Sequence, residues 1–316
     1  VDKDGEIYRE IDLPTDTQAF SGFFQGLGIE IKSICLETGS LSRSHCVELT
    51  ELGYNVKCLD ARKVSAFLKT NSHKNDRNDA RMIAELARMD CLNSVYVKSN
   101  ESVEIKSILK SRLLLIDDRT AKKNTVRGIL KHNGLKLKGP TSSIASFISA
   151  VKLSIVPLDS MTKDAVEIIL RSLEEGEHLI NEMNKLTACL EEKHSEIITL
   201  FKTVDGIGTI TALAFLGEID DPNRFKNGRL VGAYIGCVPT LYESGEISIK
   251  GSISKTGPAY LRSLLHEAAI VLLTRTKKWS KLKAWGMKLA RSKGTKKASI
   301  ALARKMSTIL WKKRKI

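Results

Sequence analysis

Several features that would assign a protein to a special class are absent from this sequence of 316 residues. No apolar run approaches the roughly 18 residues that cross a bilayer, and the first residues, VDKDGEIYRE, contain no apolar signal core. The six cysteines are scattered without a CxxC pair, which argues against a zinc site and a disulfide framework. We therefore expect a soluble, cytoplasmic protein without a membrane partner, long enough for two or three compact units.

Acidic residues are missing from the C-terminal part of the chain, where none follows Glu267. Between Arg275 and Lys315 the sequence has sixteen Lys or Arg, interleaved with three tryptophans, and the whole chain has a net charge of +15. A run of charge is usually only a solvated face, but a basic tail without counter-charges favours nucleic acid over a membrane surface. The candidate contacts within this tail are Lys277, Lys278 and Arg291.

The first ninety residues alternate between strand and helix patterns. Residues 5–14 suggest an extended segment, and Thr15 and Asp16 are suited to cap a short helix that ends near Gly26. An apolar run over 31–37, a helical pattern over 42–53 and a second apolar run over 54–60 then predict a strand, a helix and a strand. This order indicates an α/β layer with a mainly parallel sheet.

The middle of the chain is helical. Residues 101–132 form a basic pattern suited to lie along phosphates, and a second helical stretch runs from about Lys163 to Lys202. Its apolar residues recur at spacings of three, four and seven, as in the seam of a helical hairpin or coiled coil: Leu173, Ile180, Met183, Leu190 and Ile197. Packing within one chain and dimerisation explain this seam equally well.

Three acidic residues form the first candidate site. Asp76 and Asp79 stand three residues apart at the predicted start of a helix, so both carboxylates project from one face. Glu37 ends the strand over 31–37, where a sheet delivers side chains to the edge of an α/β site. Three hard oxygen ligands suit Mg²⁺ or Mn²⁺, although an Asp near a helix start is often only a cap.

Two further patterns lie in the C-terminal part. The segment Val204 to Gly208, followed by an Ala-rich helix, is typical of a helix-hairpin-helix, in which Gly206 and Gly208 let the backbone approach a phosphate. A plain tight turn between helices is the alternative. The Gly-flanked serines of SGEISIKGSISKTG lack a His–Asp pair at a recognisable spacing, so the residues alone describe a loop.

The acidic blocks LETGS and KNDRNDA, followed by RFKNGRLVGAYIGCVP and SGEISIKGSISKTGPAYLRSLL, resemble the DEDD transposases of the insertion-sequence-110 family, which are related to Piv-type DNA invertases. The resemblance covers nearly the whole chain. It implies an α/β plus mostly helical fold. Its parts would be a RuvC-like, RNase H-type domain over 1–135, a helical coiled-coil segment over 136–200 and a helical transposase domain with a helix-hairpin-helix over 201–316.

The resemblance also implies chemistry. Glu37, Asp76 and Asp79 match the last three acids of an Asp, Glu, Asp, Asp metal site. The family is associated with a serine that attacks DNA, for which Ser244 is the first choice and Ser254 the second, and the nearby Lys250 and Lys255 are suited to stabilise phosphate charge. Some members use a structured guide RNA, which the basic segments would also suit.

One departure from the family pattern concerns its first Asp, which lies on an opening strand of the Gly-Ile-Asp type. The present sequence begins beyond such a strand, and Asp2 and Asp4 in the turn DKDG are poor substitutes. We therefore expect an N-terminally truncated chain that keeps the fold, binds divalent metal weakly and does not cut DNA.

For a complete protein of this kind, the predicted function is that of a metal-dependent transposase that cleaves and transfers DNA strands of an insertion element, and that forms a homo-oligomer because recombination holds two DNA segments at once. The alternatives are a site-specific DNA invertase of the same fold and a nucleic-acid-binding remnant without catalysis.

Overall fold

The computed structural model describes residues 1–68, 75–91, 93–244 and 247–315. The chain divides into two compact units, residues 1–99 and 100–316. The fold is mostly helical with two small sheets, and no helix in the described ranges is long and apolar enough to cross a membrane.

The first unit is built on a strand, a helix and a strand, as predicted. β1 (Ile34–Glu37) pairs in parallel with β2 (Val56–Leu59), and α2 (Ser42–Glu51) connects them. Its other helices are α1 (Thr17–Gly26), α3 (Ala61–Leu68) and α4 (Asp76–Arg88). A small core forms around Leu59, Val64 and Leu86.

The ends of these elements follow the local sequence. The Asp16 carboxylate caps α1 by accepting a hydrogen bond from Ala19 N at 3.0 Å, as the sequence predicted. Gly53 ends α2 with a φ of +90°, a conformation that glycine adopts without strain. The expected extended segment at 5–14 is not a strand in the structure, and Ile7 and Ile11 are half exposed at 47% and 51%.

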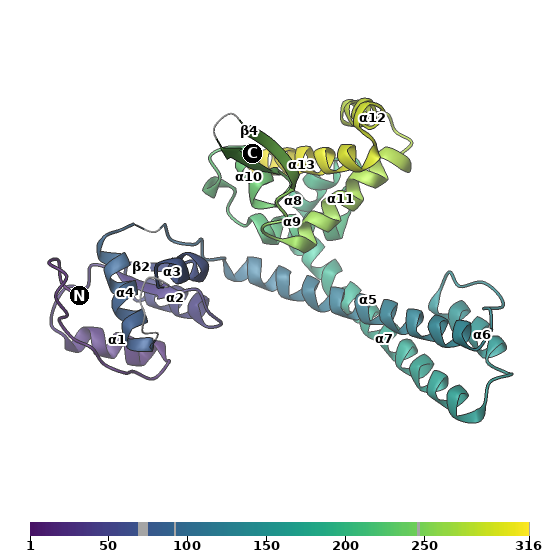
Figure 1. The fold of residues 1–316 in the computed structure, drawn as a ribbon, viewed down its shortest axis with the longest axis horizontal. Coiled ribbons are helices and arrows are strands. Elements are labelled where there is room, and N and C mark those ends of the chain that lie inside the picture. Colours follow the sequence, from purple (N-terminus) through teal and green to yellow (C-terminus); the bar gives the residue numbers. More distant parts are fainter. Residues whose placement is uncertain (69–74, 92, 245–246, 316) are drawn as a thin grey trace. The chain divides into compact units, whose positions relative to one another are not determined.

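The second unit begins with a long antiparallel hairpin of α5 (Asn100–His132) and α7 (Ser160–Lys193), with α6 (Ile144–Ser154) at its far end (Figure 1). Leu173, Ile180 and Leu190 of the predicted seam are buried within this single chain. Polar contacts also run along the hairpin: Lys193 with Glu104 at 2.7 Å, Arg112 with Asn184 at 2.8 Å and Arg119 with Glu177 at 3.0 Å. The seam is therefore used in packing inside one chain.

The predicted helical stretch from Lys163 to Lys202 is two helices. α7 ends at Lys193, and α8 (Ser195–Lys202) begins after His194, whose φ of −116° interrupts the helical backbone. The change in direction lets α8 pack on α9 (Thr209–Ile219), in which every residue from Thr211 to Ile219 is buried.

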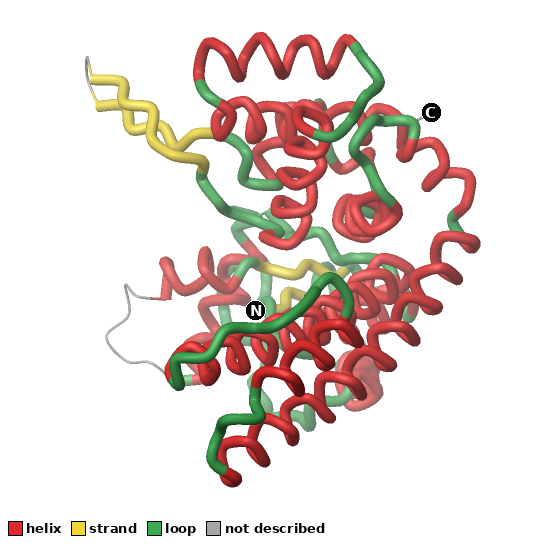
Figure 2. Tube along the Cα trace, turned by 90° about the vertical axis from the view of Figure 1, so that its right-hand side faces the viewer, coloured by secondary structure: helices red, strands yellow, loops and turns green. Residues whose placement is uncertain are grey.

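The core of the second unit surrounds α9. The remaining elements are the short helix η1 (Pro222–Arg224), α10 (Gly228–Tyr234), β3 (Pro239–Ser244), β4 (Ile247–Ile253), α11 (Ala259–Thr274), α12 (Lys281–Lys293) and α13 (Thr295–Arg314). Apolar residues of α8, α9, α11 and α13 share one cluster. β3 and β4 form an antiparallel hairpin that extends away from the helices of this unit (Figure 2).

Candidate acidic site and nucleic-acid surfaces

The two aspartates lie where the sequence placed them, on the first turn of α4. The Asn75 side chain caps this helix by accepting a hydrogen bond from Asn78 N at 2.8 Å, so neither Asp76 nor Asp79 is needed as the cap. Asp76 is exposed and Asp79 is half-buried. Their carboxylates therefore project near the N-terminal end of α4.

Glu37 is the last residue of β1 and is half-buried, and α4 packs against this strand. None of the three carboxylates forms an ion pair with a described residue. They do not form a closed ligand cluster, however, because the described residues contain no group of three His, Cys, Asp or Glu side chains arranged to hold a metal ion.

Two of the three arginines of α4, Arg77 and Arg81, pair with an acid outside the candidate site. Glu10 accepts hydrogen bonds from the Arg81 guanidinium, one of them at 2.9 Å to Nη2, and lies 3.6 Å from Nε of Arg77. The hydrogen bond from Arg81 lowers the pKa of Glu10. Because Glu10 engages both arginines, Asp76 and Asp79 remain available to a cation from solution.

Asp2 is engaged in the turn that the sequence predicted at DKDG. Its Oδ1 accepts hydrogen bonds from Asp4 N and Glu6 N, both at 2.9 Å, and the bond from Glu6 lowers the pKa of the carboxyl group. This turn gives Asp2 a local structural role.

The two glycines between α8 and α9 have different surroundings. Gly206 has a φ of +92°, and a Cβ atom there would lie 2.5 Å from the carbonyl oxygen of Ala268 on α11. Gly208 is exposed at the N-cap of α9, and a Cβ atom there would meet nothing within 4 Å. The close backbone approach that requires Gly206 is thus an approach to α11 within the core.

The candidate serines lie in and after the β3–β4 hairpin. Ser244 ends β3 opposite Ile247, while Gly245 and the side chains of Ser244 and Lys250 lie outside the described part of the structure. Ser254 follows β4, and its hydroxyl is 3.0 Å from that of Thr256. Lys255 is exposed and has a φ of +54°.

The basic stretch from Arg275 to Lys315 is not a tail, because it folds into α12 and α13 and supplies part of the core. The α13 side chains of Leu302, Met306 and Leu310 are fully buried. The apolar residues recur every four positions, so they form one face of the helix, and the lysines and arginines occupy the others. This four-residue spacing is present in the sequence, but the many lysines and arginines around it led to the prediction of a basic tail.

The tryptophans of this stretch differ in exposure. Trp311 is buried and donates a hydrogen bond to the Pro222 carbonyl at 2.8 Å, whereas Trp279 is 64% exposed. The Lys305 ammonium lies 4.1 Å from the ring centre of Trp285, a favourable cation–π arrangement. The predicted contacts Lys277, Lys278 and Arg291 are all exposed.

Several basic side chains of α5 form ion pairs with acids of the second unit. Lys106 forms an ion pair with Glu218 at 2.8 Å, Lys122 with Asp118 at 2.6 Å, and Arg119 with Glu177 as described above. These cations are less available to phosphates than the composition of the helix suggests.

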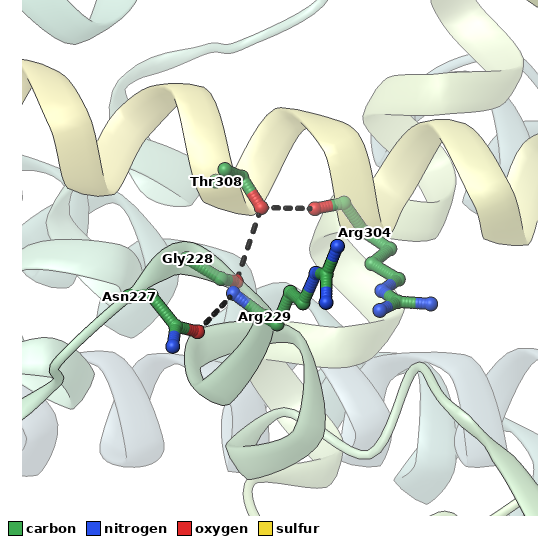
Figure 3. Close-up of a pocket in the computed structure, with 5 residues that line it drawn as sticks. All are labelled: Asn227, Gly228, Arg229, Arg304 and Thr308. Atoms are coloured by element: carbon green, nitrogen blue, oxygen red, sulfur yellow. Dashed lines mark hydrogen bonds between the residues drawn. The ribbon is translucent and has the colours of Figure 1, made fainter.

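One constellation was missed by the sequence analysis. A pocket lies between the start of α10 and the middle of α13, lined by Asn227, Gly228, Arg229, Arg304 and Thr308 (Figure 3). Its two arginines are 75 residues apart in the sequence, so no local motif joins them. The segment KNGR carries the only sequence signal, a helix-capping Asn followed by Gly and Arg.

Comparison with known proteins gives two matches to family profiles. Residues 1–133 match the DEDD transposase profile of IS110 elements, and residues 198–284 match the profile described as the transposase IS116/IS110/IS902 family.

Several transposases are similar to this protein over most of its chain. The transposase for insertion sequence element IS1111A of Coxiella burnetii is 30% identical over 262 residues, which cover 82% of this chain and 71% of that protein. A probable family 20 transposase of Pseudomonas aeruginosa is 30% identical over 84% of this chain and 78% of its own length. The transposase for insertion sequence element IS1328 of Yersinia enterocolitica is 26% identical over 83% of this chain and 78% of its own length.

Proposed function

This chain belongs to the IS110 family of transposases, which are enzymes that act on DNA, and we propose from that premise that it cleaves and transfers strands of its insertion element with the help of a divalent metal. The observation that carries the proposal is the placement of Glu37, Asp76 and Asp79. These acids stand at a strand end and on a neighbouring helix start, and none is neutralised by a described basic side chain.

The residues fit a hard cation by the chemistry of their donors. Carboxylate oxygens are the ligands that Mg²⁺ and Mn²⁺ prefer, and the family's DEDD name refers to a set of four such acids. Glu37, Asp76 and Asp79 would hold the ion, and a bound ion would supply charge to align the attacking and leaving oxygens of a phosphodiester. A three-ligand cluster does not exist among the described residues, so further ligands are expected to complete the site.

We assign the nucleophile to Ser244, with Ser254 as the second choice. In this step the serine Oγ forms a bond to phosphorus, the bond from phosphorus to the leaving sugar oxygen breaks, and the serine proton passes to that oxygen. Ser244, at the end of β3, pairs with Ile247, at the start of β4. The serine therefore lies near the tip of the extended hairpin. Lys255 is exposed at the base of the same hairpin and is suited to meet phosphate charge.

A cleavage assay tests this function. The complete protein encoded by the reading frame is incubated with DNA carrying the element ends, with Mg²⁺, Mn²⁺ or a chelator. We expect cleavage that requires metal, a loss of cleavage without loss of binding in Asp79→Asn, and full activity in Glu85→Gln, which removes an acid of α4 that pairs with Arg88. Metal-independent cleavage, or equal activity of Asp79→Asn and the parent, would contradict the metal proposal.

The nucleophile has a separate test. Ser244→Ala should abolish a covalent protein–DNA adduct while leaving binding intact, and a persisting adduct would move the assignment to Ser254. The same assay separates the other functions: inverted products indicate a DNA invertase, and binding without any cleavage indicates a nucleic-acid-binding remnant. Stimulation by a transcript of the element would identify a guide RNA, and light scattering of the DNA complex measures the homo-oligomer.

A further inference from the structure

The pocket between α10 and α13 is held in shape by direct helix packing. A Cβ atom on Gly228 would overlap the Thr308 methyl group, and one on Gly232 would lie 3.0 Å from Cγ of Arg304. Thr308 Oγ1 is 3.2 Å from the carbonyl oxygens of both Gly228 and Arg304. The two glycines thus let α10 lie against α13, and this contact fixes the stem of Arg304.

The polar groups of the pocket are mainly donors. The Asn227 Oδ1 accepts from Arg229 N at 3.0 Å and from Leu230 N at 3.2 Å, so these two amides of α10 are already satisfied and the Asn227 amide group is left to donate. An anion in the pocket would therefore be bound by side chains and not by the end of this short helix.

No acid among the described residues offsets the positive charge of the pocket. Both arginine side chains line it, from α10 and from α13 (Figure 3). In the described part of the chain, neither guanidinium forms an ion pair with an acid, and no carboxylate is among the lining residues. Two like charges held close together by packed helices repel each other, and a bound anion would relieve that repulsion.

We propose that Arg229 and Arg304 together clamp one backbone phosphate of DNA in this pocket. The inference rests on the proposed function, because the phosphate is supplied by the transposase's own substrate. Guanidinium groups present paired N–H donors that match phosphate oxygens, and the rigid walls reduce the cost of orienting them. The volume of about 360 Å³ admits a phosphate with its adjoining sugar. Such a contact fixes the position of the duplex without reading its sequence.

The test measures DNA affinity as a function of salt. Arg229→Gln, Arg304→Gln and the double variant are compared with the parent by fluorescence anisotropy on a labelled random-sequence duplex. The matched control is Arg171→Gln, which removes the same charge from an exposed site on α7. Circular dichroism and melting temperature identify any variant that fails to fold, and Arg304→Lys keeps the charge and most of the packing stem if Arg304→Gln does not fold.

If both arginines bind the same phosphate, the salt dependence of DNA affinity should change by the amount expected for one contact. We expect the double variant to lose about tenfold or more in affinity at physiological salt and to flatten the slope of log K against log salt by about 0.9, the value for one phosphate of duplex DNA. Two independent contacts would flatten it by about 1.8 instead. Arg304→Lys should retain the slope and lose part of the affinity, because an ammonium lacks the paired donors.

Each other outcome has a defined meaning. If the parent binds DNA but the folded double variant binds equally well, or no worse than Arg171→Gln, the clamp is refuted and the proposed function stands. A slope change of about 1.8 also refutes the shared phosphate. If the parent itself binds no DNA at low salt, the proposed function fails.

Discussion

Replacing Gly206 by Ala tests whether this glycine serves packing or ligand contact. The glycine pattern of the sequence predicted phosphate binding at this position, whereas the structure places Gly206 against the carbonyl of Ala268. The new Cβ atom would lie 2.5 Å from that oxygen, and an ordinary contact begins near 3.4 Å. The turn or α11 would therefore have to move by the 0.9 Å between these two distances.

The cost of this substitution has two parts. A positive φ costs a residue with a Cβ atom about 1 to 2 kcal/mol, and overpacking a core costs about 1 to 3 kcal/mol. Together they lower the free energy of unfolding by about 2 to 5 kcal/mol, which corresponds to a melting temperature about 4 to 20 °C lower for a unit of this size.

Thermal denaturation followed by circular dichroism measures the effect, with Gly208→Ala as the control in the same turn. Gly208 has a φ of −100° and open space around it, so its substitution should cost less than about 1 kcal/mol. DNA affinity measured well below the melting temperature should be unchanged in Gly206→Ala. An unchanged melting temperature together with weakened DNA binding would refute the packing argument and restore the phosphate contact.

Three further predictions concern the second unit. Gly228→Ala should destabilise it by about 1 to 3 kcal/mol, and adding Thr308→Ser, which removes the overlapping methyl group, should recover most of that loss in thermal denaturation. Burial raises the pKa of Tyr234 to about 12 from an ordinary 10.0. The stability that the protonated side chain contributes is therefore complete below pH 10.0 and is lost as the pH rises toward about 12. Tyr234→Phe should reduce this alkaline loss of stability, which denaturant titrations between pH 10.0 and about 12 would measure. Leu302→Ala should cost about 2 to 5 kcal/mol, whereas Leu114→Ala, at a site 68% exposed, should change the melting temperature little.

Local patterns in the sequence were enough to predict the elements around the acidic site. The apolar runs that became β1 and β2, and the cap residue Asp16 before α1, act over a few residues, so they can be read directly. The positions of Glu37, Asp76 and Asp79 at element ends were predicted for the same reason. Their distances from one another depend on how α4 packs on β1, and the expected three-acid cluster is absent from the described residues.

Contacts between distant segments explain the remaining differences. The break at His194 is set by the packing of α8 on α9, and Gly206 is required by α11, which lies some sixty residues further along the chain. The pocket with Arg229 and Arg304 arises only when α13 packs on α10. The C-terminal stretch was predicted to be a basic tail from its lysines and arginines, but every fourth residue from Leu302 to Leu310 is apolar and forms the buried face of α13.

The burial of α13 in the core makes the fold of the second unit depend on the last helix of the sequence. A mutation that introduces a stop codon shortly before α13 would remove Leu302, Met306 and Leu310 together with Arg304. The product would expose the apolar surface of α9 and α11, and cellular proteases remove such unfolded chains. A chain shortened before α13 would therefore not accumulate as a folded protein that binds DNA without completing the reaction.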